Sequence, residues 1–254
     1  MSVARLRSVT GASTHQGQVR DHNEDGWFVS EDRGVWAVAD GMGGHENGEW
    51  ASGVVVEALG KLQLSGSFED RCEQIAAALH DANDTIQKEA GSSGKQIGTT
   101  AVVLFVQEGR FAILWVGDSR AYLLRALELH QLSKDHTQVQ EMVDLGMLKA
   151  EEAGHHPMRH VLARAIGVTA EIQVDVIVDE VDPGDTFLLC SDGLHCCVTD
   201  DAIARTLAGP SLDDITSELV NQALDQGAPD NVTVVGVRFR EATVPAMAQS
   251  GEAS

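Results

Sequence analysis

Short apolar runs that end at an aspartate beside a glycine recur along this chain and constrain its fold most. Three such runs lie at 35–39, 111–116 and 186–190. Five acidic positions lie where a strand is expected to end or begin: Asp25, Asp40, Asp118, Asp192 and Asp230. Strand ends are rigid, and an adjacent glycine lets the backbone approach a ligand closely. Each Asp-Gly pair taken singly is more typical of a turn, but together they indicate a shared site.

The order of the expected elements favours an α+β fold. Periodicity of three to four residues predicts helices, whereas short apolar or alternating runs predict strands. The expected strands are 35–39, 99–106, 111–116, 121–125, 127–132, 172–181, 186–190 and 231–239, and the expected helices are 46–64, 68–89, 200–208 and one from Ser211. Residues 136–166 are predicted to form a helical insertion or lid rather than core. Because strands and helices do not alternate regularly, antiparallel sheets with segregated helices are expected.

The charge of the chain limits the class of partner. The 254 residues include 39 acidic and 18 basic ones, so the formal net charge is −21. This acidity argues against nucleic acid, because phosphate backbones reward Lys and Arg. It favours binding of cations or of basic protein segments, and a merely solvated acidic surface explains it equally well.

The cysteines and the hydropathy pattern indicate a cytoplasmic protein. The four cysteines include no Cys-x-x-Cys pair and are too few for a disulfide scaffold, so reduced thiols are expected. The first ten residues have no apolar segment of the signal-peptide kind. No apolar run approaches the roughly 20 residues of a membrane span, so no membrane partner is expected.

Several converging carboxylates would form a dense negative site that is stable only with cations bound. Oxygen-only ligands select hard cations such as Mg²⁺ or Mn²⁺. The flanking residues make the pattern more specific. The characteristic segments are Arg20-x-x-Asn23-Glu24-Asp25, Asp40-Gly-Met-Gly-Gly-His45, Gly98-Thr-Thr100, Gly117-Asp-Ser-Arg-Ala-Tyr122, Lys134-Asp-His-Thr137, Ser191-Asp-Gly-Leu194 and Asp230-Asn231.

This ordered set resembles the bacterial branch of the PPM family, the metal-dependent protein phosphatases of type 2C. The resemblance covers about residues 10–240. It implies a four-layer α-β-β-α sandwich, in which two antiparallel sheets are flanked by helices and a helical flap at 136–166 lies beside the metal site. We therefore expect one phosphatase domain over 1–240 and a flexible tail over 241–254.

The resemblance also implies roles for individual residues. Asp40 would bridge two Mn²⁺ or Mg²⁺ ions, joined by the carbonyl of Gly41, while Asp192 and Asp230 would complete the first ion. Asp118, with Asp192, would take a third ion, and Glu24 and Asp25 would hold metal-bound waters. Arg20 would bind the substrate phosphate, because a planar guanidinium can bind two oxygens at once.

The implied reaction is hydrolysis of phosphoserine and phosphothreonine by direct attack of a metal-bridging water. The expected partners are phosphorylated proteins and a cognate bacterial Ser/Thr kinase, and a monomer is expected. A cysteine-nucleophile mechanism is excluded, because no cysteine has an arginine six positions later. The alternative is a non-catalytic regulatory module, a pseudophosphatase that binds phosphoproteins. Such a module is expected to lack metal carboxylates, and none is missing here.

Three groups of residues stay open at this stage. His45 is a candidate proton donor to the leaving group, although a polar loop residue is the simpler interpretation. The histidines at 155, 156 and 160 suggest transition-metal binding or, more simply, a solvated or substrate-facing loop. Cys196 and Cys197 suggest a redox switch or, more simply, buried small apolar residues.

Overall fold

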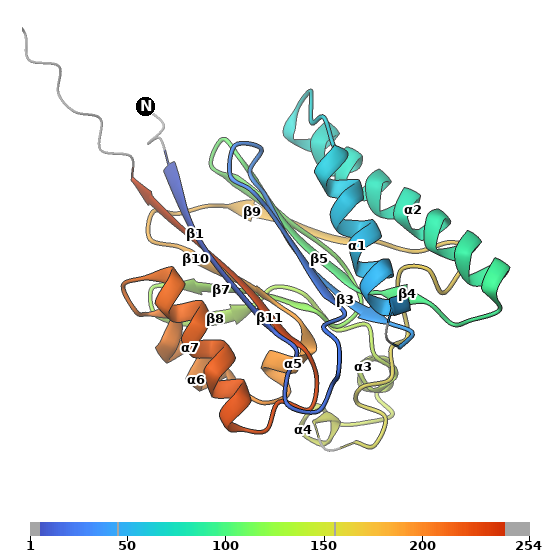
Figure 1. Ribbon diagram of the computed structural model, residues 1–254. Coiled ribbons are helices and arrows are strands. Elements are labelled where there is room, and N and C mark those ends of the chain that lie inside the picture. The colour runs from blue at the N-terminus through green and yellow to red at the C-terminus, as the bar shows by residue number, and fades with distance from the viewer. Residues whose placement is uncertain (1–5, 45, 155, 242–254) are drawn as a thin grey trace, which may run out of the picture.

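The computed structural model describes residues 6–44, 46–154 and 156–241 and arranges them as four layers (Figure 1). Two antiparallel sheets face each other, and helices cover both outer faces, which confirms the predicted α+β sandwich. One sheet has the strand order β1-β11-β10-β7-β8, and the other has the order β2-β3-β5-β6-β9, with β4 paired to β3. The strands are β1 (Leu6–His15), β2 (Asp25–Ser30), β3 (Val35–Met42), β4 (Gly98–Thr99), β5 (Ala101–Gln107), β6 (Arg110–Val116), β7 (Arg120–Arg125), β8 (Glu128–Gln131), β9 (Asp175–Glu180), β10 (Thr186–Cys190) and β11 (Val232–Glu241).

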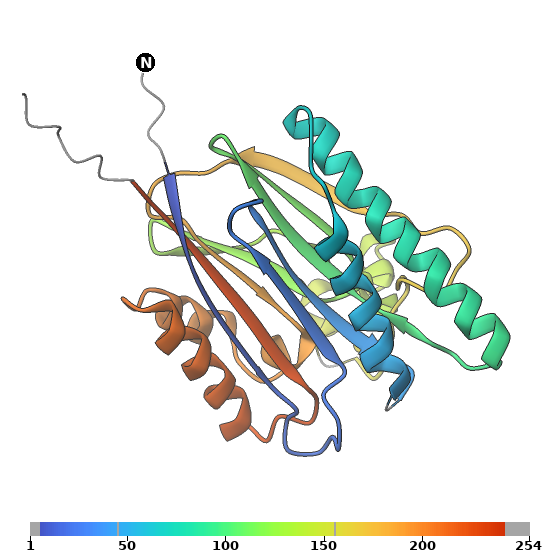
Figure 2. The same ribbon diagram turned by 45° about the horizontal axis from the view of Figure 1, so that its top comes forward.

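The helices divide between the two outer faces and the flap. Helices α1 and α2 lie side by side over the β2–β9 sheet, whereas α6 and α7 cover the other sheet (Figure 2). The helices are α1 (Glu46–Lys61), α2 (Phe68–Ser93), α3 (Gln138–Asp144), α4 (Ala150–Ala153), α5 (Asp192–His195), α6 (Asp200–Leu207) and α7 (Leu212–Asp225). Among the described residues, no helix combines the length and the apolar character needed to cross a bilayer.

In the described part of the chain, three apolar cores lie between the four layers. In β3, Val35 and Ala37 pack toward α1 and α2, while Trp36 and Val38 pack between the two sheets. In β10, Leu188 packs toward α6 and α7. Central strands are therefore buried on both faces, which is why their sequences read as continuous apolar runs rather than as alternating ones.

Strands β1 and β2 were not predicted from the sequence. Strand β1 pairs with β11 over ten residues, from Leu6 opposite Glu241 to His15 opposite Val232. It is an edge strand with several part-exposed polar side chains, so it lacks the apolar pattern that marks a strand. Its pairing with a strand more than 200 positions away outweighs that weak local signal.

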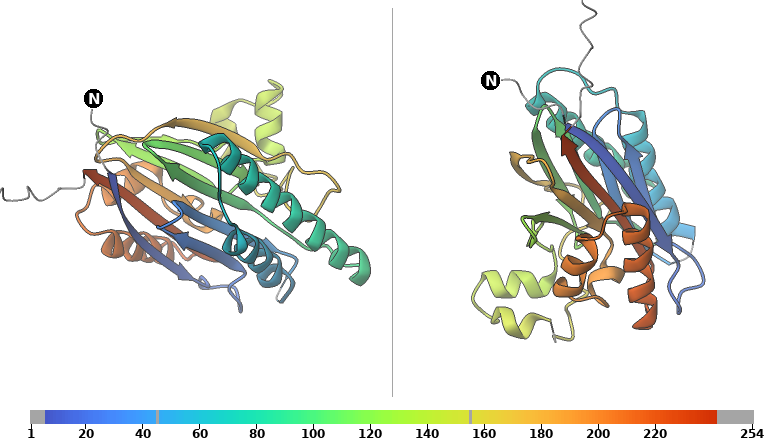
Figure 3. Two further views of the ribbon diagram at one scale, coloured as in Figure 1. Left: turned by 90° about the horizontal axis from the view of Figure 1, so that it is seen from above. Right: turned by 90° about the vertical axis from the view of Figure 1, so that its left-hand side faces the viewer.

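The flap contains α3 and α4, which stand clear of the two sheets in both views of Figure 3. Its end is anchored, because Thr99 and Ile166 exchange backbone hydrogen bonds of 3.0 and 2.8 Å. Ala165 and Ile166 are buried, and Ile166 belongs to the core under α1 and α2. The prediction that 136–166 lies outside the core is therefore wrong for this last part of the segment.

Candidate metal centre

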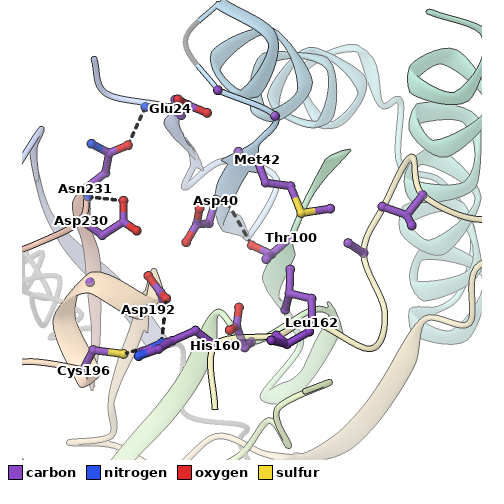
Figure 4. Close-up of a pocket in the computed structure, with 18 of the residues that line it drawn as sticks. Glu24, Asp40, Met42, Thr100, His160, Leu162, Asp192, Cys196, Asp230 and Asn231 are labelled. Carbon is purple, nitrogen blue, oxygen red and sulfur yellow. Dashed lines mark hydrogen bonds and ion pairs between the residues drawn. The ribbon is translucent and has the colours of Figure 1, made fainter. Parts of the chain in front are cut away.

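The predicted acidic residues meet in one cleft of about 710 Å³. It lies where β3, β6 and β10 end and where β2 and β11 begin. Figure 4 shows carboxylates from these separate segments pointing into it. The predicted site residues that line the cleft are Arg20, Glu24, Asp40, Gly41, Asp118, Asp192 and Asp230. Asp25 is not among the lining residues but lies opposite Asp40 in the β2–β3 ladder.

Asp40 is held in place by its backbone. Its N–H donates to Thr100 Oγ1 at 3.0 Å, and its carbonyl accepts from Thr99 Oγ1 at 2.9 Å and from the Thr100 N–H at 2.8 Å. Gly41 follows, where a β-carbon would collide with the carbonyl oxygens of Gly48 and Glu24. These contacts hold the chain at Asp40 without engaging its carboxylate.

Asp25 and Asp192 are connected through the residue between β10 and α5. The Ser191 hydroxyl donates to Asp25 Oδ2 at 2.8 Å and accepts from the Thr233 N–H at 2.9 Å. Within the described ranges, Asp25 Oδ1 and Asp192 Oδ1 are buried and have no hydrogen-bond partner. An unpartnered buried oxygen of Asp192 in the cleft, with another on the neighbouring Asp25, is an observation that a bound cation would explain.

Asp118 lies in the connection that carries the chain from one sheet to the other. It is 7% exposed. The preceding Gly117 has a positive φ of 108°, and its N–H donates to His136 Nδ1 at 3.1 Å. The Asp118 carbonyl lies 3.1 Å from His195 Nε2. The two histidines therefore fix the backbone on both sides of this carboxylate.

Asn231 is a positioning residue whose role the sequence did not reveal. Its Nδ2 donates to the carbonyls of Gln16 and His22 at 2.9 and 2.8 Å, and its Oδ1 accepts from the Glu24 N–H at 2.8 Å. These three bonds join the loop before β2 to the start of β11. The Asp230-Asn231 pair was the available signal, although only its aspartate has an obvious ligand role.

Arg20 and Asp230 bond directly to each other. The distance from Nη2 to Oδ2 is 2.6 Å, and both side chains are part-exposed at the cleft. This bond, together with the charge of Asp230, raises the pKa of the Arg20 guanidinium. The predicted phosphate-binding residue and one predicted metal ligand are therefore neighbours.

The cluster strongly disfavours ionised carboxylates. Burial, followed by the charge of Asp25, raises the pKa of Asp40 well above its ordinary value, and burial with the charge of Asp192 does the same for Asp118. Burial raises the pKa of Asp25 to about 7, and burial together with the charge of Asp230 raises that of Asp192 to about 6. Divalent cations would offset this repulsion.

The sequence also singled out histidines and a pair of adjacent cysteines as candidates. His45 and His155 lie outside the described residues, so their predicted roles stay predictions. The prediction that Cys196 and Cys197 are buried apolar residues is wrong for Cys196, which is exposed and lines the cleft. Cys197 is half-buried against the core under α6 and α7.

Comparisons with known proteins point to one family. The family model described as protein phosphatase 2C matches residues 11–232. The serine/threonine protein phosphatase PstP of Mycobacterium tuberculosis is 39% identical over 226 residues, which is 88% of this chain but only 43% of that protein's length. The serine/threonine phosphatase stp of Listeria monocytogenes is 34% identical over 232 residues, which is 87% of this chain and 92% of that protein.

A solved structure agrees with this result. The catalytic domain of serine/threonine protein phosphatase PstP, in complex with two manganese ions, matches with a TM-score of 0.83. It is 35% identical, and the match covers 93% of this chain and 100% of that one.

Proposed function

Because the chain belongs to the protein phosphatase 2C family, we propose that it hydrolyses phosphoserine and phosphothreonine in proteins, with two Mn²⁺ or Mg²⁺ ions in the cleft. One observation carries the proposal: buried and half-buried aspartates from distant segments converge in a single cleft, and the buried Oδ1 of Asp192 has no partner in the described part of the chain. The Listeria relative, which this chain matches over nearly its whole length, is a serine/threonine phosphatase.

The donors in the cleft fit hard cations, since they are carboxylate and carbonyl oxygens. Asp40, Asp192, Asp230 and the Gly41 carbonyl would hold the two ions. Asp118 would hold a third ion with Asp192, and Glu24 and Asp25 would act through water. When bound, such ions neutralise the phosphoryl oxygens and acidify water.

Arg20 is the proposed residue that orients the substrate. A guanidinium carries five N–H donors, so its bond to Asp230 leaves further donors for phosphoryl oxygens. Its half-exposed position at the cleft suits a phosphate presented on a protein surface. The bond to Asp230 would also keep the guanidinium directed into the cleft before substrate arrives.

The wider setting is part of the same proposal. We propose that residues 1–240 act as one phosphatase domain, with 136–166 as its flap. The partner would be a cognate Ser/Thr kinase, the protein would be a monomer, and its location would be the cytoplasm. The free cysteines among the described residues support a reducing compartment. A pseudophosphatase is disfavoured, because every predicted ligand in the described ranges either lines the cleft or, for Asp25, lies opposite Asp40.

The test is metal-dependent turnover. With Mn²⁺, the protein should hydrolyse p-nitrophenyl phosphate and a phosphothreonine peptide, and EDTA should stop both reactions. Asp40→Asn should lower kcat by at least about 100-fold with an unchanged circular dichroism spectrum, whereas Asp179→Asn, on the exposed strand β9, should not change it. Turnover that survives EDTA, or a nearly normal Asp40→Asn enzyme, would refute the proposal.

A further inference from the structure

One side of the cleft carries nitrogen and sulfur donors that hard cations do not require. His160 lies in the flap after α4, and Cys196 lies at the C-terminal end of α5. His160 Nδ1 is 3.7 Å from Cys196 Sγ and 3.9 Å from Asp192 Oδ2. Figure 4 shows the His160 imidazole pointing toward both the Cys196 thiol and the Asp192 carboxylate.

We propose that His160, Cys196 and Asp192 form a second binding site, which shares Asp192 with the carboxylate cluster and takes a thiophilic divalent ion, with Zn²⁺ as the best-suited metal. The three donor atoms all lie within 4.8 Å of one another. In a tetrahedral zinc site, Zn–S and Zn–N bonds of about 2.3 and 2.0 Å separate the sulfur and nitrogen by about 3.5 Å. The observed 3.7 Å nearly matches this separation.

The other two distances, from Asp192 to His160 and to Cys196, shorten with small side-chain movements; both are at most 4.8 Å. Nitrogen and oxygen ligands of one tetrahedral zinc ion are about 3.3 Å apart, which is shorter than the observed 3.9 Å between His160 and Asp192. His160 and Cys196 are both exposed, so rotation of either side chain meets little resistance from packing. Three protein ligands also leave a fourth position for water on the open side.

The proposed zinc site and the carboxylate cluster differ in their donor atoms, and therefore in the metal that each prefers. Thiolate and imidazole ligands favour Zn²⁺, whereas carboxylates and carbonyls suit Mg²⁺ and Mn²⁺. Binding forms a metal–sulfur bond, and the thiol proton of Cys196 is released to solvent. Mg²⁺ or Mn²⁺ at ordinary concentrations should therefore leave the Cys196 thiol unligated, whereas Zn²⁺ should bind it.

Asp192 connects the two sites through its two oxygens. Oδ2 is the atom nearest His160, whereas Oδ1 is buried and unpartnered within the described residues. Zinc at the new site would draw the Asp192 carboxylate toward His160 and tie the flap to α5 beside the cleft. We expect zinc to inhibit turnover for this reason. The inhibition rests on the proposed phosphatase function, whereas the binding itself does not.

Cobalt spectroscopy tests the binding without any activity measurement. The reduced protein, residues 1–254, is saturated with Mg²⁺, which is spectroscopically silent, and then titrated with Co²⁺. Wild type and Cys197→Ala should develop a thiolate-to-cobalt charge-transfer band with one Co²⁺ per chain, and Zn²⁺ should remove it. Cys196→Ala should show no band, and His160→Ala should bind at least about tenfold more weakly. Cys197 is the matched control, because it is the neighbouring thiol but packs against the core.

A wild-type protein without the band, or a Cys196→Ala protein with an undiminished band, would overturn the site. Inhibition is measured separately, as the Zn²⁺ concentration that halves Mn²⁺-supported hydrolysis of p-nitrophenyl phosphate. This concentration should be at least about tenfold higher for Cys196→Ala than for Cys197→Ala. Equal values would overturn the inhibitory consequence. An inactive protein that shows the band would count against the proposed function and not against the zinc site.

Discussion

Replacing Asp192 by asparagine should stabilise the metal-free protein while it destroys turnover. The reason is that Asp192 lies in a cleft where its charge is disfavoured. Its Oδ1 is buried and has no partner in the described ranges, and burial, together with the charge of Asp230, raises its pKa to about 6. Asparagine keeps the shape of the side chain and removes the charge.

The magnitude follows from the pKa. The ordinary value is 3.8, so the folded protein holds the Asp192 proton more tightly than the unfolded chain does. The contribution of protonated Asp192 to the free energy of unfolding is fully present below pH 3.8 and is lost as the pH rises through about 6. A pKa difference of about two corresponds to about 3 kcal/mol at pH 7.5 and to about half of that at pH 5. For a chain of this size, 3 kcal/mol is about 6–12 °C in Tm.

Urea unfolding in EDTA and reductant measures this effect at pH 7.5 and pH 5. Asp192→Asn should exceed wild type by up to about 3 kcal/mol at the higher pH, and the gap should narrow at the lower pH. With Mn²⁺ present, wild type should gain stability and the variant should gain little.

Asp185→Asn is the matched control, because Asp185 is a buried aspartate, at 1% exposure, whose carboxylate accepts bonds of 2.9 and 2.6 Å from Arg125. This variant should lose about 1–3 kcal/mol of unfolding free energy. If Asp192→Asn were also less stable than wild type in EDTA at pH 7.5, the electrostatic account of the cleft would be refuted.

Three further predictions concern the residues around the carboxylates. Arg20→Ala should raise KM for a phosphothreonine peptide by about 10–100-fold with a smaller effect on kcat, because a charge-assisted bond to phosphate is lost; steady-state kinetics with an unchanged KM would contradict this role. Asn231→Ala should lower the free energy of unfolding by about 2–4 kcal/mol, since three hydrogen bonds between the β2 loop and β11 disappear, and urea denaturation measures the loss. Gly41→Ala should lower Tm and weaken Mn²⁺ binding in calorimetry, because the new β-carbon meets backbone oxygens, whereas Gly53→Ala in α1, with open space around it, should raise stability by about 0.5–1 kcal/mol.

The sequence predicted the interior of the sandwich better than its edges. Strands β3 and β10 were recognisable because burial on both faces makes their sequences continuously apolar. Strand β1, by contrast, was not predicted, because it lies at the edge of its sheet and has several part-exposed polar side chains. The edge strand β9 was predicted, because its apolar residues alternate with polar ones. Edge strands take their stability from a partner strand, and nothing local in their sequence reports that partner.

Site residues could be predicted where the functional group itself would bind the ion or the phosphate. They could not be predicted where the residue acts by contacting and positioning other groups. The aspartates stood out because carboxylates beside glycines suit cations. Asn231 acts through hydrogen bonds to three backbone groups. Cys196 is exposed because it lies at the end of the short helix α5, whereas Cys197 packs inward. Both properties depend on a geometry that arises only after the chain has folded.

Antiparallel topology explains why the carboxylates converge. Neighbouring strands run in opposite directions, so the edge where one strand ends is also the edge where the next begins. Asp40 near the end of β3 therefore lies opposite Asp25 at the start of β2, and Asp192 after β10 lies beside Asp230 before β11.

The bonds that fix the chain at Asp40 and between the β2 loop and β11 involve backbone groups, Thr99, Thr100 and Asn231. Asp25 and Asp230 also accept bonds through their carboxylates, whereas Asp192 Oδ1 accepts none in the described ranges. For that reason a neutral side chain at position 192 should leave the backbone in place, and stability and turnover should change in opposite directions.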